Sequence, residues 1–108
     1  MKIILTVDVG HPPRKPDQVE YQLEETFSQV RNSSTLCIMK IIHGQSGKTK
    51  QIARNWAHNK RRYLRRIIYG ENYTIFDKQT QEMRDEMGDF PDTDLEATNG
   101  GITILWVK

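Results

Sequence analysis

Three side chains that can accept or donate protons follow the first two apolar stretches of this chain. Asp8 and His11 come after the apolar run that begins at Ile3, and His43 directly follows the run Thr35–Ile42. Histidine transfers protons near neutral pH, and a carboxylate can orient a histidine or activate a hydroxyl group. With a group that holds the phosphate, these residues could cleave a phosphodiester. RNA would supply its own 2′-hydroxyl as nucleophile without a metal, although the same three side chains could also hold one, such as Mg²⁺.

A glycine-containing loop follows the second apolar stretch and is the candidate phosphate-binding element. Gly44 and Gly47 lie between a predicted strand and a predicted helix, and Lys48 and Lys50 begin that helix. Backbone amides in such a loop attract anions, and the N-terminus of the helix adds positive potential. The stretch is not a Walker loop, because G-x-x-x-x-G-K-[ST] needs a glycine where Ile42 stands. The glycines could equally serve only to adopt a positive φ.

The charges of the chain are segregated along its sequence. Eight Lys or Arg residues and no acidic residue lie between Lys48 and Arg66, whereas seven acidic residues and one Arg lie between Glu82 and Glu96. The formal net charge is only +2. A segregated basic stretch favours a polyanion, and we expect nucleic acid, held by Lys48, Lys50, Arg54, Arg61, Arg62 and Arg65. The alternative is that the two stretches neutralise each other in space.

The hydrophobic pattern predicts the elements that position these residues. Lys2–Val9 and Thr35–Ile42 are predicted strands, and the second is apolar nearly throughout, as in a sheet covered by helices. A helix is expected from Pro16 onward. Its buried stripe is Val19, Leu23, Phe27 and Val30. A second helix follows the glycine loop, with an inner face of Ile52, Ala53, Trp56 and Ala57.

The second half of the chain shows weaker periodicity than the first. Asn72–Asp77 is a predicted strand, and a hairpin turning at Gly70–Asn72 is an alternative arrangement for the residues before it. The acidic stretch Lys78–Asn99 is expected to be a loop or an insertion, with a short helix near Thr80–Met87. Gly100–Lys108 is the predicted last strand.

The 108 residues therefore predict one α/β domain with the order β-α-β-α-β-β. Right-handed crossovers give a two-layer sandwich with both helices on a mixed four-stranded sheet. If the first two strands are parallel neighbours, the loops after Asp8 and Ile42 emerge at the same edge, where open α/β sheets carry ligands. No apolar run is long enough to span a membrane, no signal peptide is expected, and the lone Cys37 suits a reduced, cytoplasmic protein.

The order of these motifs resembles the small MutS-related (Smr) domain. The stretches that carry the resemblance are "TVDVGH" at the first strand, "IIHGQSG" at the second, a helix with a tryptophan, and "GGITILWVK" at the end. The family has Asp-x-His at the first position and H-G-x-G at the second. Here His11 and Gly47 each lie one residue later than in that pattern. The resemblance covers roughly Ile3–Trp56 and Gly100–Lys108, and residues 60–99 match poorly.

The resemblance implies a nucleic-acid-binding domain, with endonuclease activity on RNA or nicking of DNA among its functions. It implies catalytic roles for Asp8, His11 and His43, and a fold similar to the C-terminal domain of the third bacterial translation initiation factor. The implied partners are RNA, DNA or the ribosome. No cofactor is expected, with Mg²⁺ as an open alternative. Two other functions stay open: a non-catalytic RNA-, ribosome- or DNA-binding module, and a protein-interaction domain that uses the acidic 82–96 segment.

Overall fold

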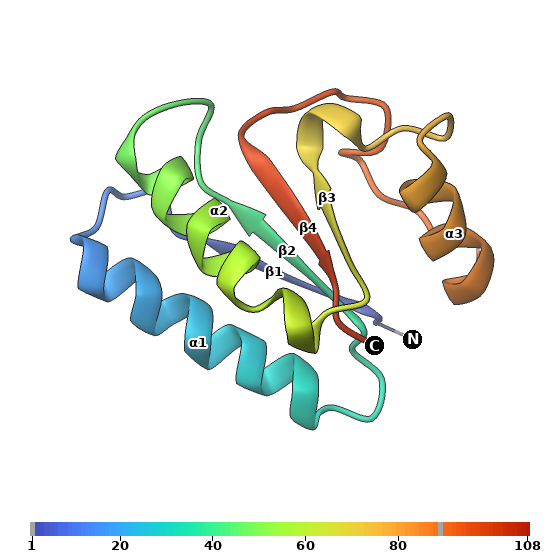
Figure 1. Cartoon of the computed structure of the whole chain (residues 1–108), viewed down its shortest axis with the longest axis horizontal. Helices are drawn as coiled ribbons and strands as arrows, with labels where there is room; N and C mark the ends of the chain where they lie inside the picture. The colour runs from blue at the N-terminus through green and yellow to red at the C-terminus, as the bar shows by residue number, and fades with distance from the viewer. Residues whose placement is uncertain (1, 89) are drawn as a thin grey trace.

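The computed structural model describes residues 2–88 and 90–108 and has four strands, three α-helices and two 3₁₀ turns in that part of the chain. The elements alternate as in the predicted order, with an additional helix before the last strand (Figure 1). In chain order they are β1 (Ile4–Asp8), α1 (Pro16–Asn32), β2 (Ile38–Ile42), α2 (Lys48–Asn59), η1 (Arg61–Tyr63), β3 (Arg66–Tyr69), η2 (Gly70–Asn72), α3 (Lys78–Met87) and β4 (Ile102–Trp106).

The four strands form one mixed sheet in the order β1-β2-β4-β3. β1 and β2 are parallel, and β4 runs antiparallel to both β2 and β3. In the parallel pair Asp8 lies opposite Ile42, so the two strands end at the same level. The predicted α/β class, the mixed four-stranded sheet and the parallel pairing of the first two strands are confirmed. The loops that follow β1 and β2 therefore leave the sheet side by side.

Helices α1 and α2 cover one face of the sheet, which is the two-layer arrangement expected (Figure 1). The predicted stripe of α1 is buried at every position: Val19, Leu23, Phe27 and Val30. Trp56 of α2 meets the Phe27 ring edge-on, with 5.6 Å between the ring centroids. Each large apolar side chain buried in this way contributes roughly 1.5–3 kcal/mol to folding. This packing fixes α2 against the sheet and so fixes the loop that precedes it.

Helix α3 lies on the opposite side of the sheet, near β3 (Figure 1). Its N-terminus is capped by Asp77, whose side chain accepts the Thr80 amide at 2.9 Å. Met83 packs with Ile68 and Tyr73 in a second apolar cluster, which the segment around Phe90 and Leu95 helps to cover. The short helix expected near Thr80–Met87 is confirmed, although it begins at Lys78.

Two predictions for the middle of the chain are wrong. Asn72–Asp77 is not a strand; the third strand is Arg66–Tyr69, and the residues after it form turns that lead into α3. The hairpin at Gly70–Asn72 does not form either, because β3 pairs with β4. Gly70 lets the turn after β3 pass close to the segment before β4. A Cβ at this position would lie 2.0 Å from the Asn99 carbonyl oxygen and would clash with it.

Helix α2 carries only part of the basic stretch 48–66. Its last residue is Asn59, and the chain then turns through η1 before β3. The basic residues after position 59 therefore do not lie on the helix that carries Lys48, Lys50 and Arg54. In the part of the chain that is described, no helix has the length and apolar character needed to cross a membrane.

Candidate functional site

The loop after β1 is closed by its own aspartate. One carboxylate oxygen of Asp8 accepts the backbone amides of Gly10 and His11, at 2.9 and 3.0 Å. The His11 side chain is 71% exposed, and its Nδ1 lies 3.4 Å from the same carboxylate oxygen. Asp8 thus shapes the turn and also lies beside an exposed imidazole. Such a pair can exchange a proton with a bound molecule, because the rest of the ring faces solvent.

The loops after β1 and β2 pack directly against each other. A Cβ on Gly10 would lie 3.0 Å from both the carbonyl carbon and the carbonyl oxygen of His43, so a side chain there would force the loops apart. The Val9 amide donates to the Ile42 carbonyl at 2.9 Å, which continues the pairing beyond β1. The predicted meeting of the two loops at one edge is confirmed at the level of the backbone.

His43 is buried at this edge, with 2% of its surface exposed. Its Nδ1 lies 2.8 Å from the Gly44 carbonyl oxygen, and its Nε2 lies 2.8 Å from the Thr103 hydroxyl. A carbonyl only accepts hydrogen bonds, so we assign the proton to Nδ1, and Nε2 then accepts from Thr103. Burial lowers the pKa of His43, and nearby Arg54 and Lys50 lower it further. His43 is a neutral imidazole with both nitrogens engaged, and it holds the Gly44 carbonyl in place.

Arg54 of α2 extends this series of hydrogen bonds from Thr103 to Glu71. Its Nε donates to the Thr103 hydroxyl at 3.1 Å, and its two terminal nitrogens donate to the Glu71 carboxylate at 3.1 and 2.6 Å. The guanidinium carbon lies 4.2 Å from the centre of the Tyr69 ring. Arg54 lowers the pKa of Glu71 to about 2. Arg54 was expected at a phosphate, but its donors are used within the chain.

Thr103 and Glu71 are residues that the sequence interpretation did not identify. Thr103 was the one polar residue in the otherwise apolar run Ile102–Trp106, and its hydroxyl links Arg54 to His43. That polar residue in a buried strand was the available signal. Glu71 had no comparable signal, because it lies in a turn that was interpreted as part of a hairpin.

The loop after His43 presents backbone amides and two lysines. Gly44 and Gly47 both have φ of +94°, a conformation that favours glycine. Gly47 is the N-cap that directly precedes α2, and the first turn of α2 has no acidic residue. Lys48 is exposed, and the Lys50 ammonium donates to the Gln45 carbonyl at 3.1 Å. The loop is an exposed, positively charged end of a helix.

A turn before β4 braces this glycine loop. The Gly44 amide donates to the Gly101 carbonyl at 3.1 Å, and the Gln45 side chain donates to Asn99 at 2.7 Å. A Cβ on Gly101 would lie 3.2 Å from the Gly44 carbonyl carbon. The glycine-rich entry to the last strand therefore allows a close approach to the loop after β2.

The remaining predicted basic contacts lie beyond the other end of α2. Arg61 and Arg62 are exposed in η1. Arg65 donates to both carboxylate oxygens of Glu86 at 2.7 Å, and the Arg66 guanidinium lies 3.1 Å from Glu82. The 12 residues of α2 span roughly 18 Å, so these arginines do not share one site with Lys48. Mutual neutralisation of the basic and acidic stretches is confirmed for Arg65 and Arg66.

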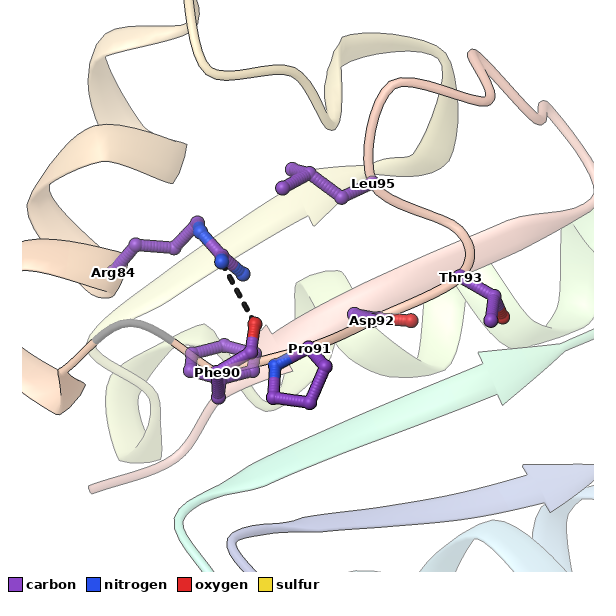
Figure 2. Close-up of a pocket in the computed structure, with 6 residues that line it drawn as sticks. All are labelled: Arg84, Phe90, Pro91, Asp92, Thr93 and Leu95. Atoms are coloured by element: carbon purple, nitrogen blue, oxygen red, sulfur yellow. Dashed lines mark hydrogen bonds between the residues drawn. The ribbon is translucent and has the colours of Figure 1, made fainter.

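Figure 2 shows a surface pocket that lies away from this edge, between α3 and the segment after it. Arg84 donates to the Phe90 carbonyl at 2.7 Å, and its guanidinium carbon lies 4.5 Å from the Phe90 ring centre. None of the residues predicted to act in catalysis or phosphate binding lines it. The pocket therefore does not belong to the candidate site.

The structure brings Asp8, His11 and His43 to one edge without joining their side chains into one cluster. In residues 2–88 and 90–108 no three His, Cys, Asp or Glu side chains form a group that could hold a metal ion. Comparisons with protein-family models, with curated proteins and with solved structures gave no match to this chain. The resemblance to the Smr domain and to the initiation-factor domain therefore stays a prediction.

Proposed function

We propose that this chain is an Smr-like domain that binds the phosphate backbone of nucleic acid at the edge where β1 and β2 end. The observation that carries the proposal is the start of α2. A loop with two positive-φ glycines leads into a helix whose first turn contains Lys48 and Lys50 and no acidic residue. Phosphate binds at such helix ends because the amides and the helix dipole both favour a negative charge.

Ion pairs within the chain already occupy some of the basic residues that were expected to contact phosphate. Arg54 is bound to Glu71 and Arg65 to Glu86. Lys48 has no carboxylate partner among the described residues, and Lys50 binds only a neutral carbonyl. We therefore assign the leading contacts with the phosphate backbone at this edge to Lys48, Lys50 and the loop amides that follow Gly44, whose own amide is bonded to Gly101. The expected partner is RNA or DNA, including structured RNA of the ribosome.

A binding assay that compares two double variants tests this proposal. Lys48→Gln/Lys50→Gln removes the two charges at the edge, and Lys2→Gln/Lys78→Gln removes two exposed lysine charges elsewhere. Fluorescence anisotropy with labelled RNA and DNA, over a salt series, gives affinity and its salt dependence. The edge variant should lower the slope of log K against log salt by roughly 1.4–1.8, whereas the control should change it little. Equal effects of both variants would mean that nucleic acid is held only by non-specific electrostatic attraction and not at this edge.

Endonuclease activity is a second candidate function, favoured by the exposed Asp8–His11 pair. On RNA, the 2′-hydroxyl would attack the adjacent phosphorus and break the bond to the 5′-oxygen. His11 would accept the proton of the 2′-hydroxyl, and water would protonate the departing 5′-oxygen. The loop amides would stabilise the charge on the phosphate. His43, with both nitrogens engaged, would act as a positioning residue for the Gly44 carbonyl.

A cleavage assay with end-labelled structured RNA and supercoiled DNA separates these roles. His11→Ala should abolish cleavage and leave binding intact. His43→Ala should reduce both cleavage and binding, because the loop loses its anchor; circular dichroism checks that this variant is folded. Parallel lanes with Mg²⁺ and with EDTA report whether a metal takes part. Cleavage by His11→Ala at the wild-type rate would remove His11 from the mechanism.

The protein-interaction function has less support. Within the acidic 82–96 segment, Glu82 and Glu86 bind arginines of this chain, and Asp92 and Asp94 bind Lys40. Carboxylates that are paired within the domain offer a basic partner little free charge. We therefore place this function behind nucleic-acid binding.

A further inference from the structure

A polar pocket of about 390 Å³ lies where the C-terminal ends of α1 and α2 meet. Arg31 and Phe27 line it from α1, and Lys60 and Tyr63 line it from the chain that follows α2. It is separated from the glycine loop by the length of α2, roughly 18 Å. The pocket is therefore a second site, with its own residues.

Tyr63 is an exposed aromatic platform in this pocket. The residue is 56% exposed, and its amide donates to the Lys60 carbonyl at 2.8 Å, which fixes the 3₁₀ turn that carries it. The Arg31 guanidinium carbon lies 5.3 Å from the Tyr63 ring centre and 5.6 Å from the Phe27 ring centre. Arg31 thus lies beside both rings, and more than half of Tyr63 stays exposed to a planar group.

The charge around the platform is positive. The Lys60 ammonium lies 2.6 Å from the Glu24 carboxylate, which also accepts the Trp56 indole N–H at 2.9 Å. Burial opposes ionisation of Glu24, but the hydrogen bonds from Lys60 and Trp56 outweigh it and lower the pKa of Glu24. Glu24 is thus fixed and neutralised. Arg31, Arg61 and Arg62 have no carboxylate partner in the part of the chain that the structure describes.

We propose that this pocket binds one unpaired nucleotide, with its base stacked on Tyr63 and its phosphate held by Arg31. Stacking on an exposed tyrosine beside arginines is the way proteins bind single strands without reading sequence. An acidic peptide could use the arginines but would leave the exposed ring without a partner. Nucleic acid is the ligand that uses both features.

The second site deepens the proposed function, because it names single-stranded nucleic acid as the class that both ends of α2 would bind. Helix α2 contains no acidic residue, and Gln51, Asn55 and Asn59 are exposed along it. Its length of roughly 18 Å corresponds to about five steps of 3.4 Å along one strand. A strand held at Lys48 can therefore reach Tyr63 without passing a carboxylate of this helix.

Anisotropy titrations with a labelled 12-nucleotide oligouridylate, a 12-base-pair duplex and polyglutamate test the second site. The variants are Tyr63→Ala, Tyr63→Phe and Tyr21→Ala. Tyr21 is the matched control, since it is 71% exposed and lines a different pocket with Asp17 and Glu25. Tyr63→Ala should weaken binding of the single strand by about 5- to 150-fold. Tyr63→Phe and Tyr21→Ala should bind like the wild type.

The outcomes distinguish this site from the one at the glycine loop. Loss of affinity in Lys48→Gln/Lys50→Gln but not in Tyr63→Ala would overturn the second site and leave the proposed function standing. Loss of affinity in Tyr63→Ala but not in the lysine variant would overturn the phosphate site at the glycine loop and leave the second site standing. Equal losses of affinity in Tyr63→Ala and Tyr21→Ala would overturn base stacking on Tyr63. Binding of polyglutamate as tight as that of the oligouridylate would also overturn it, and would favour an acidic protein partner.

Discussion

The two faces of the sheet are covered in different ways. On the face under α1 and α2 the buried cluster is built mainly from aliphatic and aromatic side chains, contributed by two regular helices. On the other face, α3 and an irregular segment cover the sheet, and a lysine lies among the apolar residues. Regular helices bring enough apolar surface to hold themselves on a sheet, whereas the irregular acidic segment is also fixed by charge.

Lys40 is the centre of that second arrangement. It lies in the middle of β2, is 7% exposed, and its ammonium is 2.6 Å from Asp92 and 2.7 Å from Asp94. Asp92 also accepts the Tyr73 hydroxyl at 2.8 Å. A buried charge without a partner is costly, so the three ionised groups depend on one another. The acidic segment is held to the sheet at this point.

Lys40→Met should produce the largest loss of stability. It leaves Asp92 and Asp94 partly buried without their cation, and the free energy of unfolding should fall by roughly 3–5 kcal/mol. Urea denaturation measures it. The triple variant Lys40→Met/Asp92→Asn/Asp94→Asn should recover much of the loss, because no charge is then left unpaired. A loss below about 1 kcal/mol for Lys40→Met would contradict the role assigned to this lysine.

Leu23→Ala on the other face should cost about 3 kcal/mol, because Leu23 is fully buried and its removal leaves a cavity in the apolar cluster. The same denaturation experiment measures it. This loss should be independent of pH, since no ionisable group is involved. A loss that varied between pH 4 and pH 8 would show that an ionisable group contributes to the packing around Leu23.

The pH dependence of stability should separate the two faces further. The pKa of His43 is lowered, so its contribution is present above the ordinary histidine value near 6.5 and is lost as pH falls through the lower folded value. The pKa of Asp92 is also lowered, so its contribution is present above the ordinary aspartate value near 3.9 and is lost at still lower pH. Denaturation across pH should show both losses.

Two variants assign these windows. His43→Gln should flatten the decline that begins near pH 6.5, and the triple variant at positions 40, 92 and 94 should flatten the one below about pH 4. Leu23→Ala should decline in parallel with the wild type. A His43→Gln protein that retains the decline near pH 6.5 would show that another group titrates there.

The smallest effect is expected for the exposed pair Arg66–Glu82, whose side chains are 45% and 40% exposed. A double-mutant cycle with alanine should give a coupling of about 0.2–1 kcal/mol, because solvent screens the two charges. The cycle measured in high salt should give a still smaller value. A coupling comparable to the loss in Lys40→Met would mean that exposure does not distinguish the two kinds of ion pair.

The same comparison explains what the sequence could predict. The stripe Val19, Leu23, Phe27 and Val30 has helical spacing, so α1 and the face it covers followed from periodicity. The third strand did not, because Tyr73 is buried through a turn and a long-range bond to Asp92, which leave no local pattern. Lys40 likewise stood in a run that was interpreted as apolar, and nothing nearby in sequence indicated its partners.

The candidate site was predictable in its position but not in its side-chain roles. Parallel β1 and β2 bring the loops of His11 and His43 to one edge, as expected if the first two strands were parallel neighbours. The burial of His43 depends on Thr103, 60 residues later, and the ion pairs of Arg54 and Arg65 depend on turns and helices that close from afar. Residue type and spacing cannot show which cations are already paired.

The cluster at Lys40 also constrains how this sequence can change over time. Loss of Lys40 alone leaves two carboxylates without their cation, and the intermediate would be poorly folded, whereas loss of either aspartate leaves the lysine one partner. In related chains a lysine at position 40 is therefore expected to occur together with an acidic residue at position 92 or 94, and a neutral residue at 40 with neutral residues at both. By contrast, the stripe of α1 can exchange one apolar residue for another singly. The lysine that holds the irregular segment to the sheet is therefore less free to change than the regular apolar stripe.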